Sequence, residues 1–84
     1  MKTAPALIQW LLKLGGFRAV TLPPFGIYAV TGSEGDKRLA RHEGVHWQQY
    51  EKMGAVMFYL TYLYQMVRYG YRDAPMEKEA RNAE

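Results

Sequence analysis

The chain has 84 residues, a formal net charge of +3 and no cysteine. This length allows one small domain, and the lack of cysteine excludes disulfides and thiolate metal sites. Small domains often need a metal ion or a partner chain for stability, so a metal here would need nitrogen and oxygen ligands. The densest basic run, Lys37, Arg38 and Arg41, is typical of a solvated helix face, and we expect no nucleic-acid partner.

The first predicted element is a short helix near the N terminus that packs on the rest of the chain. Its apolar side is formed by Leu7, Ile8, Leu11, Leu12 and Leu14. The apolar stretch is short and no small-residue cleavage pattern follows it, so we expect no secretory signal. The predicted location is cytoplasmic or phage-associated.

Extended structure is predicted next. Pro23 and Pro24 exclude a helix. Residues 25–31 are rich in β-forming side chains and are bounded by these prolines and by the turn at 32–35. This pattern predicts a strand, at the edge of a sheet.

Helices are predicted for most of the remaining chain. Ser33 or Asp36 can cap the first of them. Pro75 suits the first turn of the last one. The predicted segments are a helix to about Met53, a break at Gly54, a helix over about 55–69, a loop at 70–75 and a helix from Pro75 through Ala80.

The predicted helix over 55–69 is strongly apolar. Its charge-free stretch has 13 residues and covers roughly 20 Å, less than the ~30 Å of a hydrocarbon core. It has a narrow polar stripe and an opposite apolar row: Thr61, Gln65 and Arg68, and Val56, Leu60, Leu63 and Val67. We expect a mostly buried helix; the alternative is an interfacial helix that contacts a membrane or a partner.

The segment His42-Glu43-Gly44-Val45-His46 carries the strongest chemical signal. Residues four apart on a helix share a face, so His42 and His46 can bind one Zn²⁺. Glu43 projects beside the metal and can act as the base that deprotonates a metal-bound water. The chain has no other histidine, and chance occurrence of this motif is rare in so short a chain.

A zinc site of this kind needs a third ligand, which must be Asp or Glu. The candidates after the motif are Glu51, Asp73, Glu77, Glu79 and Glu84. Glu51 is displaced around the same helix. Glu77 and Glu79 lie at the start of the last helix, which can pack back across the helix that carries the motif. Their side chains point about 200° apart, so only one of them can reach the ion.

The chain resembles the minigluzincins, very small gluzincin-type metallopeptidases, and similar small phage and bacterial proteins. The resemblance covers residues 41–84, about half of the chain. The matching features are the His-Glu-x-x-His motif, Gln49, the aromatic stretch 58–64, Tyr71-Arg72 and Glu77-Lys78-Glu79-Ala80.

The resemblance implies that Glu77 is the third ligand and that Ala80 packs under the motif helix. Glu79 then becomes a supporting residue or a salt-bridge partner, and is the alternative ligand. The family commonly has Asp or Asn where this chain has Arg81, so Glu79 or a backbone carbonyl is expected to orient a zinc histidine instead.

The sequence therefore predicts one zincin-like α+β domain over residues 1–84: mostly helical, with a strand or hairpin before the motif helix, then an aromatic helix and a short ligand helix. The predicted function is a zinc-dependent peptide hydrolase with one Zn²⁺ per chain and Glu43 as general base. Tyr71 or Arg72 is the expected oxyanion donor. The substrate is a peptide or protein aligned along the strand at 25–31.

Two other functions remain open. One is a catalytically inactive structural or interaction protein that zinc stabilises. The other is a helical protein that docks on a membrane or partner through residues 55–69, with an incidental motif. Glu43 favours catalysis, because a purely structural zinc site needs no base. No oligomeric state is predicted.

Overall fold

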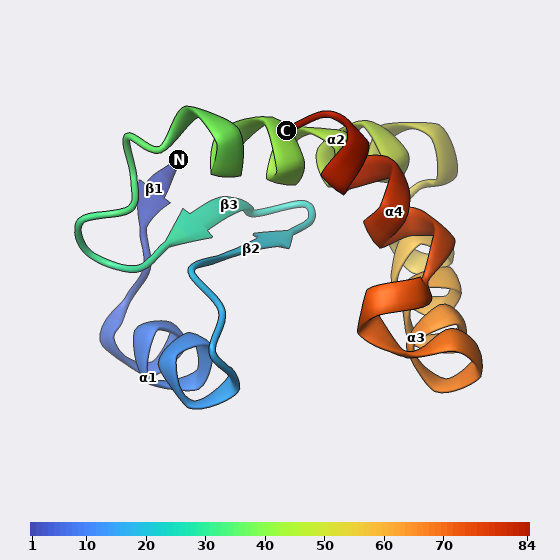
Figure 1. The fold of residues 1–84 in the computed structure, drawn as a ribbon, viewed down its shortest axis with the longest axis horizontal. Helices are drawn as coiled ribbons and strands as arrows, with labels where there is room; N and C mark the ends of the chain where they lie inside the picture. The colour runs from blue at the N-terminus through green and yellow to red at the C-terminus, as the bar shows by residue number, and fades with distance from the viewer.

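The computed structural model describes residues 1–84 and consists of a small sheet and four helices. Helix α2 runs along one side, with the sheet under one half of it and α3 and α4 against the other half (Figure 1). This arrangement confirms the predicted α+β class. The elements in chain order are β1 (Lys2–Thr3), α1 (Ala6–Gly15), β2 (Ala19–Leu22), β3 (Gly26–Ala29), α2 (Lys37–Met53), α3 (Ala55–Asp73) and α4 (Pro75–Asn82).

The sheet has the order β1-β3-β2. Strands β2 and β3 form an antiparallel hairpin in which Ala19 pairs with Ala29, and β1 pairs in parallel with β3. The predicted strand at 25–31 is thus β3, but its predicted edge position is wrong because both of its sides are paired. The two-residue strand β1 is too short to be recognised from a sequence pattern. Strand β2 is the edge that packs against α2.

Helix α2 begins as the sequence indicates. The Asp36 side chain accepts a hydrogen bond from the Leu39 amide at 3.0 Å, so Asp36 is the N-cap, and it also pairs with Arg18 at 2.5 Å. The helix ends at Gly54, which adopts a positive φ of 82° that other residues rarely tolerate. Seventeen helical residues therefore present the motif on one rigid element.

The non-helical segment between helices α3 and α4 is shorter than the sequence predicted. Gly70 interrupts α3 with φ 80° and ψ 167°, and the chain then makes a further helical turn to Asp73. The loop predicted at 70–75 is therefore wrong for most of its length. Pro75 begins α4 as predicted, and α4 packs against both α2 and α3 (Figure 1).

The burial of α3 contradicts the expectation of a mostly buried helix. Only Phe58 is buried, whereas the apolar row is exposed, up to 81% for Val67. The opposite face turns inward, where the Gln65 side chain accepts a hydrogen bond from the Met76 amide at 2.9 Å. The reason is that α4 binds the polar face of α3 and no other segment is left to cover the apolar one.

Helix α1 forms where the sequence predicts it, but it packs little. Only Leu12 is buried, and Leu7, Leu11 and Leu14 are exposed. No helix in the chain has the length and apolar character needed to cross a membrane.

Candidate metal centre

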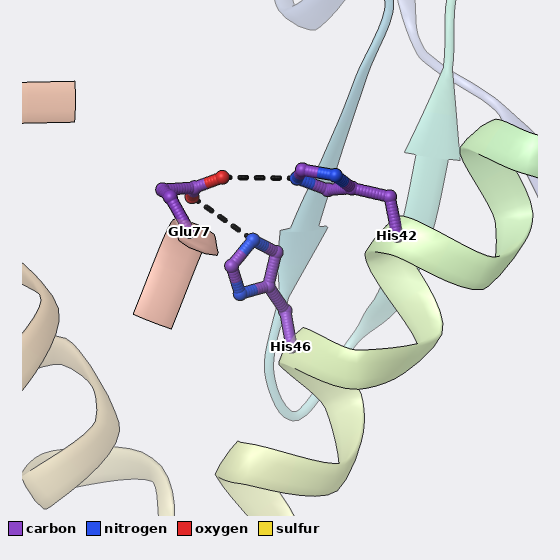
Figure 2. Close-up of side chains that lie close together, drawn as sticks. All are labelled: His42, His46 and Glu77. Atoms are coloured by element: carbon purple, nitrogen blue, oxygen red, sulfur yellow. Dashed lines mark hydrogen bonds and ion pairs between the residues drawn. The ribbon is translucent and has the colours of Figure 1, made fainter. Parts of the chain in front are cut away.

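His42 and His46 lie one turn apart on α2, and both are buried. Their rings meet edge to face, with centroids 5.2 Å apart. Both Nε2 atoms face the same carboxylate: His42 Nε2 lies 2.9 Å from Glu77 Oε1, and His46 Nε2 lies 2.9 Å from Glu77 Oε2 (Figure 2). The two histidines predicted as ligands therefore lie next to Glu77, one of the acidic residues predicted as the third ligand.

Glu77 comes from the first turn of α4 and is 1% exposed. Gln49 of α2 fixes this turn by donating from Nε2 to the Met76 carbonyl at 3.1 Å. The hydroxyl of Tyr62 donates to Glu77 Oε2 at 2.5 Å. Contacts from α2 and α3 thus hold the carboxylate in front of the two imidazoles.

Glu79 does not reach the two imidazoles. It is exposed, and its Oε1 accepts a hydrogen bond from Gln49 Nε2 at 3.2 Å. Two positions along the helix from Glu77, it is rotated by about 200° around the helix axis. The structure therefore brings Glu77, rather than Glu79, to the histidines.

The second nitrogen of each imidazole also has a partner. His42 Nδ1 lies 2.6 Å from Glu84 Oε2, and His46 Nδ1 lies 2.9 Å from Gln49 Oε1. An acceptor at Nδ1 orients the ring and leaves Nε2 free to bind a metal in the neutral form. The sequence suggested Glu79 or a backbone carbonyl for this role, but Glu84 and Gln49 occupy it; the sequence had marked Glu84 only as a candidate third ligand and Gln49 only as a feature shared with the family.

These three residues could hold a metal ion. Their ligand atoms lie within 4.8 Å of one another. The two 2.9 Å separations are slightly shorter than the roughly 3.3 Å between two ligands of a tetrahedral ion with ~2.0–2.1 Å bonds. Two imidazoles and one carboxylate suit a borderline divalent metal.

The charges at the cluster reinforce one another. The hydrogen bond with Glu77 raises the pKa of His42 against the effect of burial, and Glu84 adds to this. Burial opposes charge on His46, but Glu77 more than compensates and raises its pKa too. Burial also opposes charge on Glu77, but both histidines and Tyr62 hold its pKa far below the ordinary value. The Glu77 carboxylate is therefore ionised.

Glu43 lies beside the cluster and is not part of it. Its Oε2 is 3.9 Å from His42 Nε2, and its Oε1 accepts a hydrogen bond from the Thr21 hydroxyl of β2 at 2.9 Å. The side chain is buried, and this burial raises the pKa of Glu43. A carboxyl group with a raised pKa, fixed next to a possible metal, is suited to accept and release a proton.

A cavity of about 350 Å³ adjoins Glu43, His46 and Glu77. Ten of its 14 lining residues are hydrophobic; nine come from α1, β2 and α3, and Phe17 comes from the link between α1 and β2. Tyr62 and Tyr71 are among these ten, and burial raises the pKa of Tyr71 to about 12, so its hydroxyl keeps its proton. Arg72 is exposed and does not line the cavity. Thr21 had no signal in the sequence, because it belongs to no motif, and Tyr62 was marked only as part of the aromatic stretch 58–64.

Comparisons with known protein families, with curated proteins and with solved structures found no match to this chain.

Proposed function

We propose that this chain is a zinc-dependent peptide hydrolase of the minigluzincin type. The observation that carries the proposal is the position of Glu43. It is buried with its Oε2 3.9 Å from His42 Nε2, and it lines a cavity large enough for part of a peptide. A site that served only to bind a metal would not need this carboxylate.

The donor set supports zinc as the metal. Catalytic zinc sites usually have three protein ligands drawn from His, Asp and Glu, whereas structural sites usually have four, rich in cysteine. Here His42, His46 and Glu77 supply three, and no fourth protein ligand atom belongs to the cluster. A bound Zn²⁺ would supply Lewis acidity, which polarises a carbonyl group and lets a water lose its proton near neutral pH.

The chain's own residues would move the proton. Glu43 accepts it at its carboxylate and returns it to the leaving amine, for which its raised pKa is suited. Thr21 keeps the carboxylate in one orientation through the bond to Oε1. Tyr71, in the same cavity, keeps its proton and can donate a hydrogen bond to a developing oxyanion, although it also interacts with Glu77, to which the Tyr62 hydroxyl donates at 2.5 Å. Tyr71 is therefore preferred over Arg72 for this role.

Strand β2 offers a place for the substrate backbone. It is an edge strand, it lines the cavity from Ala19 to Leu22, and its Thr21 touches Glu43. An extended peptide can pair with the open side of such a strand. The substrate-binding strand is therefore β2, in place of β3 as the sequence suggested.

Metal content and peptide cleavage, measured on the wild type and on Glu43→Gln, test this function. The wild type should bind one zinc and cleave members of a mixed peptide library. Glu43→Gln keeps the size of the side chain, so it should retain zinc while cleavage falls by at least ~10²-fold. Cleavage equal to wild type by Glu43→Gln would refute the mechanism. A zinc-bound wild type that cleaves no peptide would favour a structural role for the metal.

A further inference from the structure

Helix α1 presents an apolar row to solvent. Leu7, Trp10, Leu11 and Leu14 recur at the spacing of one helix face, and all four are exposed, Leu14 to 71%. In a globular protein this spacing normally marks the face that packs on the core. Here Leu12 is the only residue of α1 that is buried.

Helix α3 presents a second such row. Val56, Leu60, Leu63 and Val67 are exposed on the face opposite to α4, and the ring of Tyr64, next to this row, is exposed too. In Figure 1, α1 and α3 both lie below α2. The cavity lies between them, since Leu12 of α1 and Phe58 of α3 both line it.

The charges near these rows are mainly positive. Lys13 lies on α1, Arg68 and Arg72 lie on α3, and none of the three forms an ion pair. The only acid on either helix is Asp73. Most other acidic side chains are engaged inside the fold: Asp36 by Arg18, Glu43 by Thr21, Glu77 by the histidines and Glu84 by Arg38 and His42.

We propose that α1 and α3 together bind the surface of an anionic lipid bilayer, with their apolar rows in the boundary between headgroups and acyl chains. Helices that lie in this boundary combine an apolar row with basic residues and amphipathic rings such as Trp and Tyr. Lys13, Arg68 and Arg72 supply the attraction to anionic headgroups, and Trp10 and Tyr64 supply the rings.

Charge also separates this partner from a second copy of the chain. A symmetric dimer through α1 and α3 would place the same faces together, and so would bring unpaired cations against unpaired cations with little acid to offset them. An anionic bilayer provides the complementary charge. The proposal does not depend on hydrolysis or on the metal.

Vesicle sedimentation with the full chain tests the proposal. The protein should bind vesicles of phosphatidylcholine and phosphatidylglycerol, mixed at roughly 3:1, more tightly than pure phosphatidylcholine, and added salt should weaken this binding. Leu14→Glu and Val67→Glu should each lower the partition onto anionic vesicles by about tenfold or more, because each replaces an inserted apolar side chain by an anion. Both side chains are exposed in the free protein, so folding should be unaffected, which circular dichroism checks.

Gln48→Glu is the matched control. Gln48 is exposed on α2, away from both rows, and the substitution makes the same charge change; binding should stay within about twofold of wild type. Equal binding to neutral and anionic vesicles, or no binding to either, would overturn the proposal. A second result would also overturn it: a protein that binds no vesicles but forms a concentration-dependent dimer, with the dimer disrupted by Leu14→Glu. A second copy of the chain would then cover these faces.

Discussion

Glu84 Oε2 lies 2.6 Å from Nδ1 of His42, on the side of the ring opposite to Glu77. The same residue is held from α2 by Arg41, which donates to the Glu84 backbone carbonyl at 2.6 Å. Glu84 therefore orients one of the two imidazoles of the candidate metal centre. Carboxylates in this position fix the tautomer of a metal-binding histidine and increase its basicity.

Glu84→Gln should therefore weaken metal binding without abolishing it. A loss of about 10–100-fold in zinc affinity is expected, since partners of metal-binding histidines commonly contribute this much. Competition with a chromophoric chelator measures the affinity. Glu51→Gln is the control, because Glu51 is exposed and has no side-chain partner among the hydrogen bonds and ion pairs of the chain. Equal affinities for the two variants would show that Glu84 does not act through His42.

Removal of either histidine should abolish stoichiometric metal binding. The chain has only two histidines, and both face Glu77. Native mass spectrometry should find one zinc per wild-type chain and none in His42→Ala or His46→Ala. A wild type that stays free of zinc when zinc is in excess would rule out the site.

Glu77 and Glu79 should differ sharply in their effect on stability. Glu77 is buried between the histidines, whereas Glu79 is exposed and contacts only Gln49. With zinc at ~100 times its dissociation constant, the metal should raise the melting temperature by roughly 10–20 °C. Glu77→Ala should remove that increase, whereas Glu79→Ala should retain most of it.

The effects of Glu77→Ala and of a chelator should not add, because both remove the same link between α4 and α2. Thermal melts of both variants, with and without chelator, measure this. Hydrogen exchange should further show the amides of α4 exchanging before those of α2 once the metal is removed, because α4 has only eight residues and three buried side chains. If zinc binding required Glu79 and not Glu77, the assignment of the third ligand would be wrong, but the rest of the proposed site would stand.

The stability of the chelated protein should fall as the pH rises. The pKa values of His42 and His46 are raised above 6.5, so their contribution is complete below pH 6.5 and is lost as the pH rises through the raised values. The raised pKa of Glu43 also makes the folded protein less stable as the pH rises. The pKa of Glu77 is lowered below 4.5, so its contribution is complete above pH 4.5 and is lost only in stronger acid.

The chelated protein should therefore be most stable at about pH 5–6 and less stable at about pH 8. The stabilisation by zinc should instead increase as the pH rises. Zinc must displace protons from the two imidazoles, so it binds more tightly at higher pH. Melting temperatures measured across this range, with chelator and with zinc, test both statements. A melting temperature of the chelated protein that rises between about pH 6 and 8 would contradict the assigned ion pairs.

The sequence alone determined the local part of the candidate centre. The spacing of His42 and His46 places them on one helix face wherever that helix packs, because the 3.6-residue period is a property of the backbone. Asp36 and Gly54 marked the ends of α2 for equally local reasons, a side-chain cap and a positive φ. Pro75 likewise marked the start of α4.

Tertiary structure decided which distant groups meet these local elements. Packing of α4 across α2 brings Glu77 and Glu84 to the imidazoles, and the β2 hairpin brings Thr21 to Glu43. Only the family resemblance singled out Glu77, and nothing in the sequence indicated the contacts of Glu84 and Thr21, since no local period relates residues 20 or more positions apart. The same limit explains the errors on β3 and α3. A period shows that a strand or a helix has an apolar face, but the identity of what covers that face, whether another strand, another helix or nothing in the chain, depends on the packing of the whole molecule.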